Sequence, residues 1–173
     1  AYSCAYFRDE HGTLDQAQVD KFEHICRKLM LRPGDRMLDI GCGWGGLISH
    51  AVRRHGVRAL GITLSHKQYD YASARIEREG LSDRCSVALL DYRDVTETEK
   101  FDRIASVGMF EHVGLSNLGI YFAKIERLLA DDGIAMNHGI TTMDPQNRAV
   151  GRGAGEFIDR HILLAGLAHR CGT

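Results

Sequence analysis

The sequence predicts an α/β fold with a doubly wound, mostly parallel sheet. Short apolar runs alternate with helical patterns along most of the chain, and a glycine-rich loop joins the first predicted strand to the next helix. Alternation of this kind is typical of parallel strands connected by crossover helices that cover both faces of the sheet. At 173 residues, and with no internal repeat or linker, we expect one domain spanning 1–173.

The first predicted helix follows a capping signal, Thr13 with Gln16 three positions later. Apolar residues then recur at helical spacing from Leu14 to Leu29, and an Arg-Pro-Gly-Asp breaker at 32–35 ends the pattern. The later predicted elements are a strand at 36–40, a helix at 47–55, a strand at 57–63, a helix at 65–79, strands at 85–90 and 101–107, a helix at 117–129 and a strand at 133–140. The segment 144–155, rich in Gly, Asn and Arg, predicts a loop.

Composition disfavours several classes of partner. A net charge of -1 and a pI near 6.8 give no basic excess for nucleic acid. The chain has no apolar run that could span a bilayer and does not begin with a signal peptide, so we expect a cytoplasmic protein. Its five cysteines are scattered and never form a CxxC pair, so we expect reduced thiols and no metal site.

The glycine loop at 38–46, Leu-Asp-Ile-Gly-Cys-Gly-Trp-Gly-Gly, is the strongest local signal of a ligand site. Glycines allow the backbone to approach a ligand closely, and amides at the start of a helix face it. The spacing also fits the GxGxxG pattern of dinucleotide sites, and a purely structural turn is a further alternative. The next strand ends without the carboxylate that holds a dinucleotide ribose. Asp39, immediately before the glycines, resembles instead the first motif of methyltransferases.

Several further motifs occur in a fixed order along the chain. They are Tyr-Ser-Cys-Ala-Tyr-Phe at 2–7, the glycine loop at 38–46, Gly-Ile-Thr-Leu-Ser at 61–65 with Gln68, Phe-Asp-Arg-Ile at 101–104 and Ser-Val-Gly-Met-Phe-Glu-His-Val-Gly at 106–114. From residue 1 to about 162, the set resembles the cyclopropane-fatty-acyl-phospholipid synthases and mycolic acid cyclopropane synthases. The resemblance implies a class I S-adenosylmethionine-dependent methyltransferase that transfers a methylene to cis double bonds of phospholipid acyl chains, forming cyclopropane fatty acids.

The same resemblance implies which residues bind S-adenosylmethionine. The carboxylate of the cofactor would be held by Ser3, and its methionine part by Asp39, Gly41, Cys42, Gly43 and Gly45. The ribose would be held by Thr63, Leu64 and Gln68, and the adenine by Asp91 and Tyr92. The amide of Gln68 can bond to ribose hydroxyls without placing a negative charge near the sulfonium. For Tyr92, a half-buried aromatic at a strand end is the alternative.

The resemblance also implies a bound bicarbonate that acts as base, held by Cys4, Glu111, His138 and the backbone of Ile140. Each residue alone has an ordinary alternative: Cys4 as a small core residue, His138 as a core histidine and Glu111 as an acid at a helix start. The adjacent pair Glu111 and His112 is a poor metal site, because neighbouring helical side chains point about 100° apart.

The chain departs from the family near its end. The segment 163–173 does not match the family pattern, which continues into a lipid-covering region and two further strands. We therefore expect a truncated core that lacks the last strands, exposes a sheet edge and self-associates as a homo-oligomer. Its expected partners are unsaturated phospholipid acyl chains, reached through peripheral contact with a membrane. The alternative functions are a cofactor-binding remnant without turnover and methylation of an olefin or a small amine.

Overall fold

The structure, a computed structural model, describes residues 3–139, 141–142 and 169–170. In these residues a five-stranded parallel sheet has the strand order β3-β2-β1-β4-β5, which confirms the predicted doubly wound fold. The helices are α1 (Leu14–Lys28), α2 (Gly46–His55), α3 (His66–Arg78) and α4 (Leu118–Leu128). The strands of the sheet are β1 (Arg36–Ile40), β2 (Arg58–Thr63), β3 (Cys85–Leu89), β4 (Phe101–Val107) and β5 (Leu129–His138). Short 3-10 turns are η1 (Tyr92–Asp94), η2 (Phe110–His112) and η3 (Leu115–Asn117), and β6 (Thr141–Thr142) pairs with β7 (His169–Arg170).

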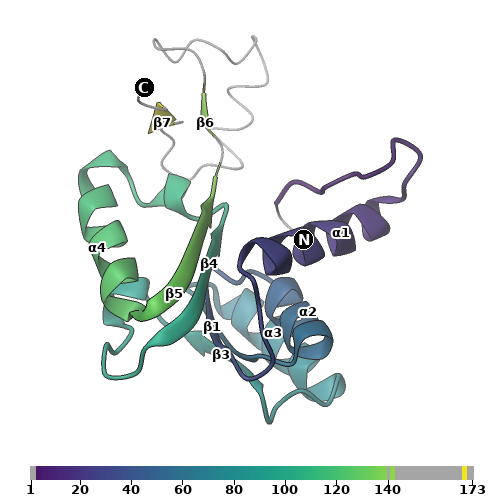
Figure 1. Cartoon of the computed structure of the whole chain (residues 1–173), viewed down its shortest axis with the longest axis horizontal. Coiled ribbons are helices and arrows are strands. Elements are labelled where there is room, and N and C mark those ends of the chain that lie inside the picture. The colour runs from purple at the N-terminus through teal and green to yellow at the C-terminus, as the bar shows by residue number, and fades with distance from the viewer. Residues whose placement is uncertain (1–2, 140, 143–168, 171–173) are drawn as a thin grey trace.

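Helices cover both faces of the sheet, with α1, α2 and α3 on one side and α4 on the other (Figure 1). The central strand β1 supplies both cores, because successive side chains of a strand point to opposite faces. Met37 packs with α1 and α2, whereas Leu38 and Ile40 pack with α4. Burial on both faces explains why this strand reads as a continuous apolar run in the sequence.

The start of α1 confirms the predicted cap, since the Thr13 hydroxyl accepts a hydrogen bond from the Gln16 backbone N–H at 3.3 Å. The inward face differs from the prediction. Leu14 is 60% exposed, whereas Lys21 is only 6% exposed and lies on the same i, i+4 line as Ala17 and Ile25. The docking of α1 on the sheet therefore buries a cation at a position where the periodicity favoured apolar side chains.

The last strand, predicted at 133–140, is present with different bounds. The strand β5 follows α4 without a loop, begins at Leu129 and ends at His138. Phe101 of β4 pairs with Leu129 of β5, and Arg103 pairs with Ile134. The two pairs are two positions apart on β4 but five positions apart on β5, so β5 is irregular between them. The Asp-Asp-Gly at 131–133 has turn chemistry, but here it lies within a strand. Ile140 and the predicted loop at 144–155 lie outside the described residues.

The strand order reverses beside β1, which pairs with β2 on one side and β4 on the other. In open sheets of this type, ligands bind in the crevice outside the carboxyl ends of the strands at such a reversal. That edge carries the glycine loop after β1, Thr63 at the end of β2, η1 after β3, η2 after β4 and His138 at the end of β5. The fold thus gathers at one edge segments that are far apart in the sequence.

Candidate active site

The glycine loop is fastened to the neighbouring strand by its own backbone. The N–H groups of Gly41 and Cys42 both donate to the carbonyl oxygen of Ile62 at 3.0 Å, and Gly45 donates to Cys42 at 3.0 Å as the cap of α2. Gly43 has a φ of 54°, which favours glycine, and a Cβ there would meet no heavy atom within 4 Å. The loop is therefore a rigid turn with open space above Gly43, where a ligand can lie against the backbone.

A buried polar cluster lies beside this loop. The ammonium of Lys21, on α1, donates to the hydroxyl and the carbonyl oxygen of Ser3 at 2.7 and 3.4 Å. Asp39 on β1 is 3% exposed, and burial raises its pKa to about 7, although the charge of Lys21 acts to lower it. Burial also lowers the pKa of Lys21, against the opposing effects of Cys4 and Asp39. The cluster thus holds a cation and a carboxyl group that is poorly solvated when ionised.

Lys21 is a site residue that the sequence reasoning missed. Its signal was available, because a charged residue at the centre of the apolar face of a predicted helix has to find a polar partner when it is buried. Only the docking of α1 shows that the partner is Ser3, eighteen residues away in the chain.

At the end of β2 the structure brings together Thr63 and Gln68, two of the residues predicted for the ribose. The buried Thr63 hydroxyl donates to Gln68 Oε1 at 2.7 Å and accepts from the Ser65 N–H at 3.2 Å. The Ser65 side chain in turn caps α3 by accepting from the Gln68 N–H. Leu64, between them, is 70% exposed. A hydroxyl and an amide are therefore held side by side next to the glycine loop.

At the end of β3 the two predicted residues are already engaged with other side chains. Both carboxylate oxygens of Asp91 accept from the guanidinium of Arg93, at 2.9 and 2.7 Å, and these hydrogen bonds lower the pKa of Asp91. Tyr92 packs edge-to-face on Tyr121, with ring centroids 5.2 Å apart, and is partly buried against the core. This packing matches the half-buried alternative for Tyr92, and the contact of both residues with an adenine stays a prediction.

The predicted catalytic residues come from three segments that meet at the ends of β4 and β5. The Gly108 N–H donates to the carbonyl oxygen of His138 at 2.8 Å, and Ser3 Cβ lies 3.9 Å from where a Cβ of Gly108 would stand. Cys4 and His138 are both exposed, so the alternatives that made each a core residue were wrong. Their thiol and imidazole can therefore contact a ligand.

Glu111 lies in η2 and is 2% exposed, whereas the neighbouring His112 is exposed, so the two side chains point apart as predicted. The preceding residue, Phe110, packs closely on Gly139: a Cβ added to Gly139 would stand 1.6 Å from the Phe110 ring. This contact holds the turn that carries Glu111 against the chain that leaves β5. The fourth predicted residue, Ile140, lies outside the described residues.

Tyr121 is a second residue that the sequence reasoning missed. Its buried hydroxyl lies 2.7 Å from Ser106 Oγ and 3.2 Å from Asn137 Oδ1, so it connects α4 to the ends of β4 and β5. Burial raises its pKa to about 12, which keeps the phenol neutral. No local pattern marks this tyrosine, because its partners lie on other elements.

Comparison with known protein families gives a match over nearly the whole chain. The family model described as mycolic acid cyclopropane synthetase matches residues 1–171. A probable fatty acid methyltransferase of Pseudomonas putida is 52% identical over 166 residues, which cover 96% of this chain and 42% of that protein. The cyclopropane-fatty-acyl-phospholipid synthase of Escherichia coli strain K12 is 48% identical over 139 residues, or 80% of this chain and 35% of that protein. The chain thus spans less than half the length of these two relatives.

Solved structures give the same result. The cyclopropane synthase MmaA2 from Mycobacterium tuberculosis superposes with a TM-score of 0.88 at 31% identity, over 98% of this chain and 62% of that one. Mycolic acid cyclopropane synthase CmaA1, solved in complex with SAH and CTAB, superposes with a TM-score of 0.84 at 33% identity, over 96% of this chain and 60% of that one.

Across the residues that the structure describes, no helix combines the length and apolar character needed to cross a bilayer.

Proposed function

Because the chain belongs to the mycolic acid cyclopropane synthetase family, we propose that it forms the S-adenosylmethionine-binding core of an enzyme that transfers a methylene to cis double bonds of phospholipid acyl chains. The observation that carries the proposal is the cluster of the buried Lys21 and Asp39 with the partly buried Ser3, beside the open glycine loop at the edge where the strand order reverses. Because the chain covers only 42% and 35% of the two relatives named above, the activity of the whole enzyme is part of the proposal.

The residues present fit S-adenosylmethionine, whose sulfonium supplies an electrophilic methyl group. Asp39 would accept the ammonium of the methionine part, which compensates the cost of ionising a buried carboxyl group. Lys21 and the Ser3 hydroxyl would face the carboxylate. The paired Thr63 and Gln68 offer hydrogen-bonding groups to the ribose hydroxyls, with Asp91 and Tyr92 next along the edge for the adenine.

On the substrate side, the reaction needs a base and stabilisation of positive charge. The π electrons of the cis double bond attack the methyl carbon, so that a C–C bond forms, the C–S bond breaks and positive charge develops on the acyl chain. Loss of a proton from the transferred carbon then allows the ring to close. The buried carboxylate of Glu111 would stabilise this charge electrostatically.

The exposed Cys4 and His138 carry an S–H and ring nitrogens that can hold a small planar anion as the base. The family resemblance makes this anion bicarbonate and adds the backbone of Ile140 to its partners. Since the double bond lies in a bilayer, we further propose that the enzyme is cytoplasmic and contacts the membrane peripherally. We also propose that the chain forms a single domain that associates with a second copy.

Two measurements test the proposal. Isothermal titration calorimetry should show one molecule of S-adenosylmethionine bound per chain. Vesicles of a cis-unsaturated phospholipid, incubated with chain and cofactor, should gain about 14 Da per double bond, the mass of one methylene. Binding without any gain in mass would overturn the transfer reaction and leave a cofactor-binding core, whereas failure to bind would overturn both.

The catalytic roles are tested with Glu111→Gln and Cys4→Ser. Both should lose most of the mass gain while their affinity for S-adenosylmethionine stays within about threefold of the unchanged chain, because neither residue is proposed to touch the cofactor. Glu126→Gln, an exposed residue on α4, serves as the control and should retain activity. Full activity of Glu111→Gln would remove Glu111 from the mechanism.

Methylation of the olefin without ring closure is the second candidate, because the relative at 52% identity is named a probable fatty acid methyltransferase. The carbocation would then lose its proton from the acyl chain and retain a double bond. The gain in mass is the same, so proton NMR of the released fatty acid separates the two products. Ring methylene signals support cyclopropane formation, and alkene signals with a new methyl branch support plain methylation.

A further inference from the structure

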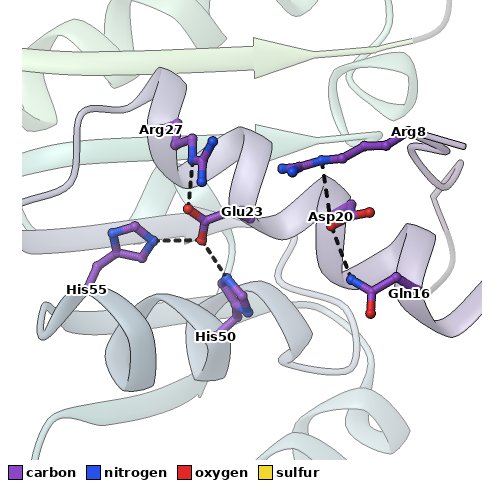
Figure 2. Close-up of polar contacts among 7 residues, drawn as sticks. All are labelled: Arg8, Gln16, Asp20, Glu23, Arg27, His50 and His55. Atoms are coloured by element: carbon purple, nitrogen blue, oxygen red, sulfur yellow. Dashed lines mark hydrogen bonds and ion pairs between the residues drawn. The ribbon is translucent and has the colours of Figure 1, made fainter.

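A second group of potential ligand residues lies between α1 and α2 (Figure 2). Glu23 on α1 projects toward His50 and His55 on α2, and its Oε2 lies 3.2 Å from Nε2 of His50 and 3.1 Å from Nε2 of His55. The two histidines approach from the same helix, with ring centroids 6.3 Å apart. One carboxylate oxygen is thus shared between two imidazole nitrogens.

These distances match the edges of a metal coordination shell. Around a tetrahedral zinc ion with bonds of about 2.0–2.1 Å to nitrogen and oxygen, neighbouring ligand atoms lie about 3.3 Å apart. The other oxygen of Glu23, Oε1, accepts from Arg27 Nε at 2.8 Å, which orients the carboxylate and leaves Oε2 facing the histidines. Hydrogen-bonded carboxylates of this kind are common among metal ligands.

Cys26 supplies the feature that a simple hydrogen-bond network would not need. Its sulfur and one ring nitrogen of each histidine all lie within 4.8 Å of one another. Cys26 is fully buried, three residues after Glu23 on the same face of α1. The two imidazoles thus lie near the sulfur of Cys26 and also contact the carboxylate of Glu23, and imidazole, thiolate and carboxylate are the ligand types that zinc prefers.

We propose that Cys26, His50, His55 and Glu23 form a zinc site that fastens α1 to α2. Bound as thiolate and carboxylate, Cys26 and Glu23 would balance the two charges of the ion, so the site would add no net charge to a partly buried place. The sequence reasoning expected no metal because it looked for closely spaced cysteines, whereas the ligands on α1 lie more than twenty residues before those on α2.

The surroundings give the ion a path from solvent. An open hollow of about 340 Å³ borders Glu23, His50 and His55, and its rim carries Arg8, Asp20, Arg27 and Arg54. Asp20 is paired with Arg8 at 3.6 Å, as Figure 2 shows, and so does not compete for the ion. A metal site needs such an entry path as well as its ligands.

The position gives the site a consequence for the fold. α2 begins at Gly46, directly after the glycine loop, and α1 carries Lys21, which holds Ser3. An ion that joins these helices would therefore hold together the two sides of the cofactor crevice without touching the cofactor. This consequence does not depend on the proposed reaction, because it concerns only metal binding and stability.

The test uses the full chain after removal of metal with a chelator and titration with zinc chloride in a calorimeter. We expect one zinc ion per chain and a rise in melting temperature. His55→Gln and Cys26→Ala should each weaken binding at least about tenfold. The matched controls are His66→Gln, an exposed histidine on α3, and Cys85→Ala, a buried cysteine in the same core as Cys26, and both should bind as the unchanged chain does.

Cobalt binding distinguishes a cysteine that ligates a metal from one that is only buried in the core. The chain loaded with Co²⁺ should show a thiolate-to-cobalt absorption band, and the band should be missing in Cys26→Ala and present in Cys85→Ala. Absence of stoichiometric zinc binding would overturn the proposal. Equal affinity in the unchanged chain and His55→Gln, checked for folding by circular dichroism, would overturn it as well.

Discussion

Replacing Asp39 by asparagine should stabilise the ligand-free protein above neutral pH and weaken cofactor binding at the same time. Asp39 is 3% exposed at the end of β1, and burial raises its pKa from an ordinary 3.8 to about 7. Asparagine has nearly the same shape but no charge, so the substitution removes the ionisation and leaves the packing in place.

The sign and size of the effect follow from proton linkage. Between about pH 4 and pH 7 the folded state keeps the Asp39 proton while the unfolded state loses it, so the free energy of unfolding falls as the pH rises. At 1.36 kcal/mol per pH unit, the gap between 3.8 and about 7 corresponds to at most about 4 kcal/mol. Asp39→Asn should therefore gain up to about that much stability, relative to the unchanged chain, between about pH 4 and pH 8.

The assay is urea unfolding of both proteins across this pH range, analysed as the difference between them. Subtracting the two curves cancels the histidines and other groups that both chains share. Asp131→Asn, an exposed carboxylate on β5, is the control and should give a flat difference. A difference for Asp39→Asn that stays within about 1 kcal/mol across the range would refute the argument from burial. In calorimetry the same variant should bind S-adenosylmethionine at least about tenfold more weakly, through loss of the ammonium partner.

Three further substitutions probe the crevice and its support. Lys21→Met should weaken binding of S-adenosylmethionine about tenfold by releasing Ser3, and affinity unchanged in calorimetry would contradict the role given to this lysine. Gly43→Ala should cost only about 1–2 kcal/mol of stability for its positive φ, yet should block cofactor binding by filling the open space, so tight binding by the folded variant would place the ligand elsewhere. Tyr121→Phe should lower the free energy of unfolding by about 1 kcal/mol in urea, and a loss near zero would show that its hydroxyl contributes nothing net.

Local sequence signals were sufficient where an element is defined by its own residues. The strands 36–40 and 101–107 were predicted with the bounds that the structure shows, because each is a short apolar run with clear punctuation. The glycine loop was located for the same reason, since its backbone conformation depends on residues within the loop. Thr63 and Gln68, predicted to share the ribose site, are hydrogen-bonded to each other, as residues five positions apart at the end of a strand readily are, and their contact with a ribose stays a prediction.

Long-range contacts explain what the sequence reasoning missed. The first residues of β5 lie before the strand predicted at 133–140, but Leu129 already pairs with Phe101 of β4. Cys4 and His138 fitted the core as well as the site by residue type, and only their exposure separates the two alternatives. Residue type alone does not determine burial, because burial depends on which elements pack together.

The sequence by itself therefore determined the fold class, the order of the elements and the family, since these follow from periodicity and from motifs a few residues long. The tertiary structure alone decided that Lys21 is buried against Ser3, and that Glu23 and Cys26 meet His50 and His55. Each of these contacts joins side chains eighteen or more residues apart in the chain. Such contacts form only when α1 docks on the sheet and on α2, because docking brings together polar groups that solvent would otherwise separate.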